Sequence, residues 1–254
     1  MTGDLAAAIA DHGFLHLPGS DMAKRLGDAG AALPEFIASW DRLVTDTHMR
    51  DGGRYRQRRI ANFAAEPGLP GHARGEHRAH FQAVAHNTLN GGVDRWFAPI
   101  EDGVGTNAAL HALLDLGRGL ADSLAGARPW FVEAHQFRIE AAPGAPGYPT
   151  PEGVHQDGVD LVIIAMLRRM NLAGGETLVE TLDSRPLARF TLRDTLDSAI
   201  LDDRRVRHGV SPIEPVNTAL PSARDVLVLT WKRRGLPKRR TIRRRKRVFT
   251  LVMP

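Results

Sequence analysis

An imidazole and a carboxylate lie two residues apart in residues 154–160, which have the sequence VHQDGVD. Side chains alternate between the two faces of an extended strand, so His155 and Asp157 would point to the same side. They would then supply two metal ligands from one element. A third ligand is needed on that side of a metal, and the best downstream candidate is His208, within RHGVSPI at residues 207–213.

Two neutral imidazole nitrogens and one carboxylate on one side of a metal leave the other coordination positions open. This is the arrangement of non-haem Fe(II) oxygenases. A His-x-Asp pair also arises by chance in a chain with eleven histidines. The chain has no cysteine, which excludes disulfides and thiolate metal ligands. Any metal must therefore be held by nitrogen and oxygen, as His155, Asp157 and His208 would hold it.

The segments around these residues are typical of a β-sheet protein. The apolar run at residues 161–167 indicates a buried strand, because it is short, rich in β-branched residues and bounded by a glycine and an arginine pair. Residues 171–179 predict a glycine turn into another strand. His208 lies on a further extended piece, and a strand follows Arg224. The order along the chain is ligand pair, turn, ligand and arginine.

This succession resembles the bacterial 2-oxoglutarate-Fe dioxygenase family that contains the free L-isoleucine 4-hydroxylases. The main likeness runs through about residues 130–231, and a weaker one extends upstream. The matching motifs are PEGVHQDGVD at residues 151–160, RMN at 169–171, GGET at 174–177, RHGVSPI at 207–213, RDVLV at 224–228, RYRQRR at 54–59 and NGG at 90–92. Their combination is far more specific than any one of them.

The resemblance implies a role for each candidate residue. His155, Asp157 and His208 would hold Fe(II), with two positions for 2-oxoglutarate and one for O2. Arg224 would bind the distal carboxylate of 2-oxoglutarate, since a planar guanidinium pairs with a carboxylate better than an ammonium does. It could otherwise be an ordinary surface arginine. Related halogenases have a small residue in place of the carboxylate ligand, so Asp157 favours hydroxylation of an unactivated C–H bond, with release of succinate and CO2.

The resemblance also implies a free L-amino acid as the substrate, and favours an aliphatic one. The ammonium of such a substrate needs a carboxylate, and its carboxylate needs a cation. Asp160 is the candidate for the first, and Arg58 or Arg138 for the second. Asp160 could instead cap a turn, Arg138 could form a salt bridge at the barrel rim, and the arginine-rich strand that holds Arg58 could face water.

Two other functions stay open. A 2-oxoglutarate oxygenase that acts on a nucleic acid, a protein or a specialised metabolite would explain a basic segment near the C-terminus. A non-enzymatic, cupin-like metal-binding module is disfavoured, because it has no use for Arg224.

Charge is distributed unevenly along the chain. The formal net charge is +5, but residues 232–247 hold eleven Lys and Arg and no acid. Without them, 23 basic residues stand against 29 acidic ones, a net charge of −6. The basic run could bind nucleic acid through its phosphates. It has no interleaved aromatic residue for base stacking, which favours a solvated extension.

At 254 residues, the chain fits one large domain. We expect a mainly β fold with flanking helices: a double-stranded β-helix, the jelly roll of cupin-like proteins, over residues 130–231. Residues 1–129 would form a mixed helical buttress and residues 232–254 a basic segment, in which the alternation at residues 248–253 favours a last strand. The proline- and glycine-rich residues 141–151 are either a lid over the metal or a plain connector.

The remaining features are less specific. No apolar run is as long as a membrane span and the N-terminus lacks a signal-peptide pattern, so we expect a cytoplasmic protein with a small-molecule partner. Nothing indicates the oligomeric state.

Four further histidines lack the spacing of a second metal site, and we interpret them as surface or core residues. They are His72, His77, His80 and His86.

Overall fold

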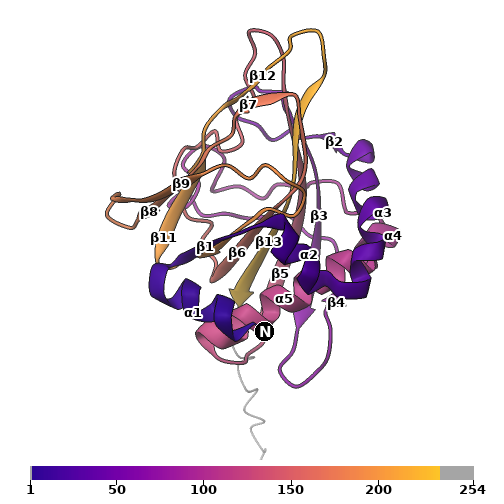
Figure 1. The fold of residues 1–254 in the computed structure, drawn as a ribbon, viewed down its shortest axis with the longest axis vertical. Helices are drawn as coiled ribbons and strands as arrows, with labels where there is room; N and C mark the ends of the chain where they lie inside the picture. The colour runs from indigo at the N-terminus through magenta and orange to yellow at the C-terminus, as the bar shows by residue number, and fades with distance from the viewer. Residues whose placement is uncertain (1, 235–254) are drawn as a thin grey trace, which may run out of the picture.

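The computed structural model describes residues 2–234 (Figure 1). Its largest element is an antiparallel sheet in the order β1-β10-β6-β13-β5-β3-β2, with β4 paired to the end of β3. The strands of this sheet are β1 (Phe14–Leu17), β2 (Val44–Thr45), β3 (Arg56–Ala65), β4 (Ala73–Arg74), β5 (Trp130–Ala141), β6 (Leu161–Met170), β10 (Ser198–Asp202) and β13 (Ser222–Arg233).

Two smaller antiparallel sheets complete the barrel. One has the order β11-β8-β9 and the other pairs β12 with β7. Their strands are β7 (Leu172–Gly174), β8 (Thr177–Thr181), β9 (Pro186–Phe190), β11 (Val206–Val210) and β12 (Ile213–Pro215). This is the expected jelly-roll architecture, mainly β with flanking helices.

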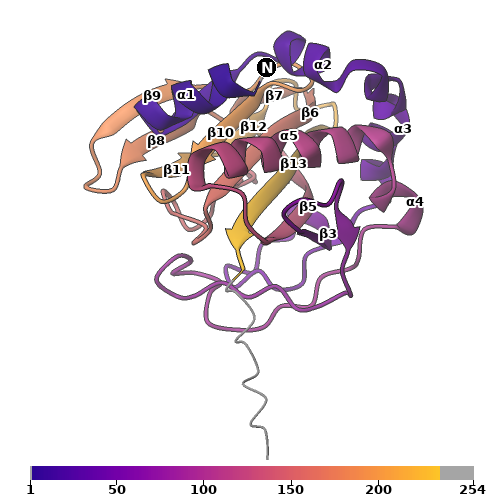
Figure 2. The same cartoon turned by 90° about the horizontal axis from the view of Figure 1, so that it is seen from below.

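Helices from the first half of the chain cover the large sheet, and Figure 2 shows α5 lying across it with α1, α2 and α3 alongside. The helices are α1 (Gly3–His12), α2 (Gly19–Leu26), α3 (Leu33–Ala38), α4 (Asp102–Gly105) and α5 (Ala108–Ala125), with 3-10 turns η1 (Gly27–Ala32) and η2 (Ser39–Arg42). Asn107 caps α5 by accepting a hydrogen bond from the Ala109 amide. Four leucines of α5 are fully buried, namely Leu110, Leu113, Leu114 and Leu120, and Gly117 lets the helix approach the ring of Trp231 on β13.

The central strands divide their side chains between two environments. On β5, Val132 and Ala134 belong to the core beneath the helices, whereas Glu133, His135 and Phe137 line a cavity on the opposite face. The period of two in the sequence produces this division, since successive side chains of a strand point to opposite faces. One face of the sheet therefore stabilises the fold, and the other is available for a site.

Two local expectations need correction. Residues 154–160 do not form a strand, because only His155 makes an isolated bridge and the rest of the segment is irregular. Gly153 and Gly158 have φ angles of 82° and 76°, which break an extended run. In addition, β1 and β3 lie before Trp130 and belong to the large sheet, so the first half of the chain supplies barrel strands as well as helices.

The segment at residues 141–151 is tied to the barrel. Gly147 and Ile213 exchange backbone hydrogen bonds of 3.0 and 2.9 Å, and the Thr150 hydroxyl bonds to the backbone of Val210. Pro149 and Thr150 line the cavity. These bonds favour a fixed wall of the cavity over a lid.

The basic C-terminal segment is described only as far as Arg234, so the strand expected at residues 248–253 lies outside the described residues. Within residues 2–234, no helix combines the length and apolar character needed to cross a membrane.

Candidate active site

The three expected metal ligands lie together at the cavity. His155 and His208 exchange two backbone N–H···O hydrogen bonds of 2.9 Å each, and their ring centroids are 4.7 Å apart. The Asp157 carboxylate lies 3.6 Å from Nε2 of His155 and 3.8 Å from Nε2 of His208. All three ligand atoms lie within 4.8 Å of one another, a grouping that suits a single metal ion.

The turn that presents Asp157 is held by a buried carboxylate that the sequence did not reveal. Asp203 accepts hydrogen bonds from the backbone amides of Asp157, Gly158 and Val159, at 2.9, 2.8 and 3.0 Å. Its side chain arrives from the turn after β10, more than forty residues downstream. Asp203 therefore fixes the backbone between the ligand pair and β6.

The electrostatics of the three ligands favour a cation. Burial opposes a charge on His155, but the Asp157 carboxylate outweighs this effect and raises the pKa of His155 to about 9. Burial likewise opposes charge on Asp157, yet His155 and His208 hold its pKa below the usual range. Burial, together with the nearby His155, lowers the pKa of His208 to about 4 and keeps it neutral. An anionic carboxylate beside imidazole nitrogens is a suitable donor set for Fe(II).

The hydrogen bonding of His155 makes Nε2 the nitrogen available to a metal. Its Nδ1 lies 3.0 Å from the carbonyl oxygen of Gly153, which can only accept a hydrogen bond. Nδ1 must therefore carry a proton, and Nε2, which faces Asp157, is the nitrogen that would lose its own proton when a metal binds. A backbone carbonyl that orients a metal-binding histidine in this way is a common supporting contact.

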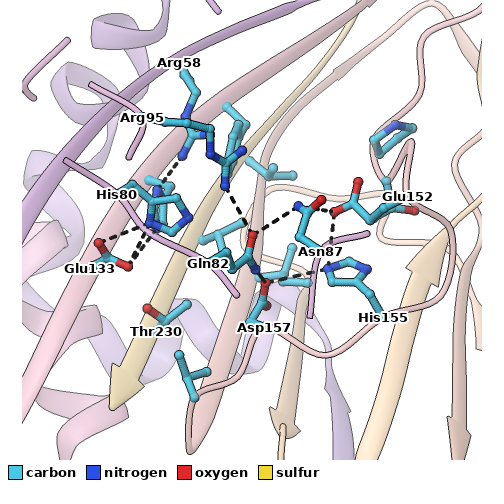
Figure 3. A pocket seen from close by; sticks show the side chains of 18 of the residues that line it. Arg58, His80, Gln82, Asn87, Arg95, Glu133, Glu152, His155, Asp157 and Thr230 are labelled. Carbon is cyan, nitrogen blue, oxygen red and sulfur yellow. Dashed lines mark hydrogen bonds and ion pairs between the residues drawn. The ribbon is translucent and has the colours of Figure 1, made fainter. Parts of the chain in front are cut away.

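A chain of amide side chains supports the Asp157 carboxylate (Figure 3). Gln82 Nε2 donates to Asp157 Oδ1 at 3.1 Å. Gln82 Oε1 accepts from Asn87 at 3.1 Å and from Arg95 at 3.3 Å, and Asn87 also donates to Glu152 at 3.4 Å. These residues were not expected from the sequence, because Gln82, Asn87 and Arg95 come from an irregular stretch in which no periodic pattern marks them.

Arg224 lies inside the same cavity and has no anionic partner within residues 2–234. Its side chain is 3% exposed, and its Nε and Nη2 atoms have no hydrogen-bond partner among the described residues. Burial and the nearby Arg169 lower its pKa to about 10. A buried guanidinium with unpaired donors is costly unless an anion binds to it. With Ile139, Ile164 and Val226 forming apolar cavity walls, this site suits a dicarboxylate such as 2-oxoglutarate.

Of the three expected substrate contacts, the structure brings only Arg58 to the cavity. Arg58 is 3% exposed, lies over the rings of Phe97 and Phe137, and places Nη2 2.8 Å from Nδ1 of His135. The cavity contains neither Asp160 nor Arg138.

Asp160 and Arg138 are instead held by partners that are distant in the sequence. Asp160 accepts hydrogen bonds from the backbone and side chain of Arg233 on β13. Arg138 binds Asp225 at 2.7 Å and Asp41 at 3.0 Å. Arg138 thus forms salt bridges, the alternative to a substrate contact that was considered for it. We therefore do not retain Asp160 and Arg138 as substrate contacts.

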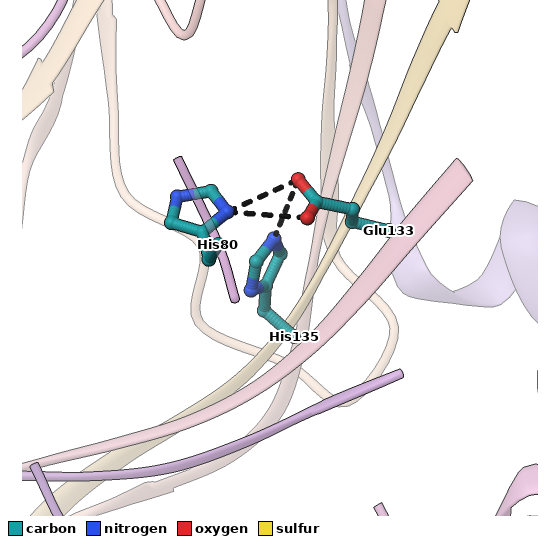
Figure 4. Close-up of side chains that lie close together, drawn as sticks. All are labelled: His80, Glu133 and His135. Atoms are coloured by element: carbon teal, nitrogen blue, oxygen red, sulfur yellow. Dashed lines mark hydrogen bonds and ion pairs between the residues drawn. The ribbon is translucent and has the colours of Figure 1, made fainter. Parts of the chain in front are cut away.

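A second cluster of ionisable side chains lies in the cavity beside the first. It consists of His80, Glu133 and His135 (Figure 4). His80 was interpreted as a surface or core residue, but it lines the cavity with its side chain 11% exposed. Its neighbours Glu133 and His135 come from β5, far away in sequence, so spacing along the chain gave no sign of the cluster.

Comparison with known proteins agrees with this geometry. The family model of the 2OG-Fe dioxygenases matches residues 37–230. The chain belongs to this family. It is thus a 2-oxoglutarate-dependent non-haem iron dioxygenase, and its cofactors are Fe(II), 2-oxoglutarate and O2.

Individual relatives add detail. A solved bsmA homolog from Methylobium petroleophilum PM1 is 34% identical with a TM-score of 0.85, and the match covers 93% of this chain and 94% of that one. The structure of IDO from Bacillus thuringiensis shares the fold at 17% identity, with a TM-score of 0.78 and coverage of 92% and 100%.

The 3(1)-hydroxy-L-isoleucine 4-dioxygenase of Pantoea ananatis is 23% identical over 163 residues. The match covers 63% of this chain and 66% of that relative's length.

The Gln82 contact leads to a first prediction. Replacing Gln82 with methionine keeps the length of the side chain but removes the amide that orients Asp157. We expect the affinity for Fe(II) to fall about 10- to 100-fold, as is common when a supporting contact to a ligand is lost. Competition with a chelator under anaerobic conditions measures this affinity.

Gln57→Met is the matched control, because Gln57 bonds to Glu140 and lies outside the cavity. An unchanged Fe(II) affinity in Gln82→Met would contradict a supporting role for Gln82.

Proposed function

We propose that this dioxygenase hydroxylates an unactivated C–H bond of a free L-amino acid, preferably an aliphatic one, and releases succinate and CO2. One observation carries the proposal. The candidate iron ligands, the unpaired Arg224 and the buried Arg58 all line a single cavity of about 370 Å³. A cavity of this size suits small molecules, and the Pantoea ananatis relative is itself a dioxygenase of a hydroxylated isoleucine.

His155, Asp157 and His208 would hold the iron. When bound, Fe(II) supplies the activation of O2, with 2-oxoglutarate as the co-substrate that is oxidised. The neutral imidazoles would offer lone pairs, and Asp157 would offset part of the metal's charge. Gln82 would keep the Asp157 carboxylate in one orientation. Arg224 would hold the distal carboxylate of 2-oxoglutarate, so that the keto-acid end points toward the ligands.

Arg58 would bind the carboxylate of the amino acid. Its Nε has no hydrogen-bond partner among the described residues, and the same holds for Arg95, which also lines the cavity. The rings of Phe97 and Phe137 fix the plane of the Arg58 guanidinium. A cation held rigidly in this way loses little conformational entropy when a carboxylate binds.

An oxygenase that acts on a nucleic acid, a protein or a specialised metabolite remains the alternative. The basic run at residues 232–247 suggested a macromolecular substrate. The part of this run that follows Arg234 lies outside the described residues. The small cavity favours the amino acid. The non-enzymatic metal-binding module is not retained, because the chain belongs to a family of dioxygenases.

Succinate release tests the substrate class directly. Protein supplied with Fe(II), ascorbate, 2-oxoglutarate and O2 should release more succinate when a pool of free L-amino acids is added, and mass spectrometry should find one amino acid heavier by one oxygen atom. If the pool has no effect on succinate release, a free amino acid is not the substrate.

Substitution of Arg224 tests the proposed 2-oxoglutarate contact. Arg224→Ala removes one partner of a buried charge pair, so we expect the KM for 2-oxoglutarate to rise at least about 30-fold. The affinity for Fe(II) should stay the same. Arg189→Ala is the control, since Arg189 forms an exposed pair with Glu176 and does not line the cavity. A KM unchanged by Arg224→Ala would place the co-substrate elsewhere.

A further inference from the structure

We propose that Glu133, held by His80 and His135, binds the ammonium group of the substrate and is not part of a second metal site. The inference rests on the proposed amino-acid substrate. It gives Glu133, on β5, the role that was expected for Asp160, which is to bind the ammonium group of the substrate.

The geometry of the cluster is that of a carboxylate between two imidazoles (Figure 4). His80 Nδ1 lies 3.2 and 3.1 Å from the two oxygens of Glu133, and His135 Nε2 lies 3.8 Å from Oε2. The Glu133 side chain is 12% exposed and lines the cavity. The spacing alone would also suit a metal ion.

The hydrogen bonding of His135 argues against a metal. Its Nδ1 lies 2.8 Å from Nη2 of Arg58, and a guanidinium can only donate. Nδ1 must accept this bond, so the proton of the neutral ring lies on Nε2, the nitrogen that faces Glu133. Burial lowers the pKa of His135 to about 4, so the ring is neutral with a single N–H. For Nε2 to bind a metal, the proton of the neutral ring would have to move to Nδ1, where it would meet the N–H of Arg58.

His155 in the iron site shows the opposite arrangement. There, Nδ1 donates to a carbonyl oxygen, so Nε2 is the nitrogen that can give up its proton and bind a metal. In the second cluster, Nε2 of His135 is an N–H donor instead. The Nδ1 atom of His80 must also carry a proton, because it faces two carboxylate oxygens that only accept. The two clusters therefore differ in chemistry although both combine two histidines with one carboxylate.

Glu133 is an anion whose charge remains available to a ligand. Burial opposes its charge, but the nearby imidazoles of His135 and His80 hold the pKa of Glu133 well below the usual range. The imidazole of His135 lies between Glu133 and Arg58, so these opposite charges do not form a direct pair. The neutral imidazole of His135 orients the carboxylate without cancelling its charge.

A zwitterion fits this separation of charges. In Figure 3, Arg58 and Arg95 lie on one side of the cavity, Glu133 lies near them, and Asp157 and His155 lie toward the other side. The substrate carboxylate would bind Arg58 and its ammonium would bind Glu133. Its side chain would then extend toward the candidate iron ligands, where the C–H bond is oxidised.

A paired-substrate experiment tests this assignment. The twenty free L-amino acids are assayed one by one, and the best of them is compared with the 2-hydroxy acid that has the same side chain. Glu133→Gln should raise the KM for the amino acid about 10- to 150-fold, since it removes a hydrogen bond between charged groups. The KM for the hydroxy acid should change less than about threefold. Its hydroxyl is neutral, so it binds the carboxylate of the unmodified protein only slightly better than the amide of the variant.

The control is Glu140→Gln, on the same strand but bonded to Gln57 and outside the cavity. It should leave both KM values unchanged. Equal losses for both substrates in Glu133→Gln would indicate a structural role for Glu133 and overturn the ammonium site. A normal KM for the amino acid would overturn it as well. If no amino acid raises succinate release in the unmodified protein, the proposed function is wrong and the ammonium site is rejected with it.

Metal content separates the ammonium site from a second metal site. Protein loaded anaerobically with excess Fe(II) and then desalted should hold one iron per chain by elemental analysis, in both the unmodified protein and Glu133→Gln. Two irons per chain, reduced to one by Glu133→Gln, would show that the second cluster binds metal and would overturn the inference.

Discussion

The candidate site depends on one short backbone pairing. His155 and His208 come from segments some fifty residues apart, and two hydrogen bonds of 2.9 Å between their main chains place their rings side by side. The segment around His155 is otherwise irregular, so this bridge and the amide bonds to Asp203 determine where Asp157 points. A pair of ligands without this support would be free to take many orientations, and a metal site requires one.

The side chains of β5 alternate between the two faces of the sheet, and this alternation connects the site to the rest of the fold. One face of the strand packs beneath the helices, and the other carries Glu133, His135 and Phe137 into the cavity. The hydrogen bonds at the Nδ1 atoms distinguish the two clusters in this cavity. A carbonyl acceptor leaves Nε2 of His155 as the nitrogen available to a metal, whereas the Arg58 donor places an N–H of His135 toward Glu133. Two similar sets of residues thus differ in chemistry through single hydrogen bonds.

The sequence predicted much of this arrangement. The jelly roll, the dioxygenase family and its cofactors are confirmed. His155, Asp157, His208 and Arg224 line one cavity, and their roles stay a prediction. The partners of charged residues could not be predicted, because they come from distant strands: Arg233 binds Asp160, and Asp225 binds Arg138. Gln82 and His80 were missed for a related reason, since they lie on irregular segments where no period in the sequence indicates which way a side chain points.

A crystal structure of the protein grown anaerobically with Fe(II) and 2-oxoglutarate would test the central claim most directly. The account predicts an anomalous iron signal between His155, Asp157 and His208, and a 2-oxoglutarate molecule whose distal carboxylate contacts Arg224. No iron signal should lie between His80, Glu133 and His135. Iron bound at that second cluster, or a co-substrate carboxylate away from Arg224, would contradict the account.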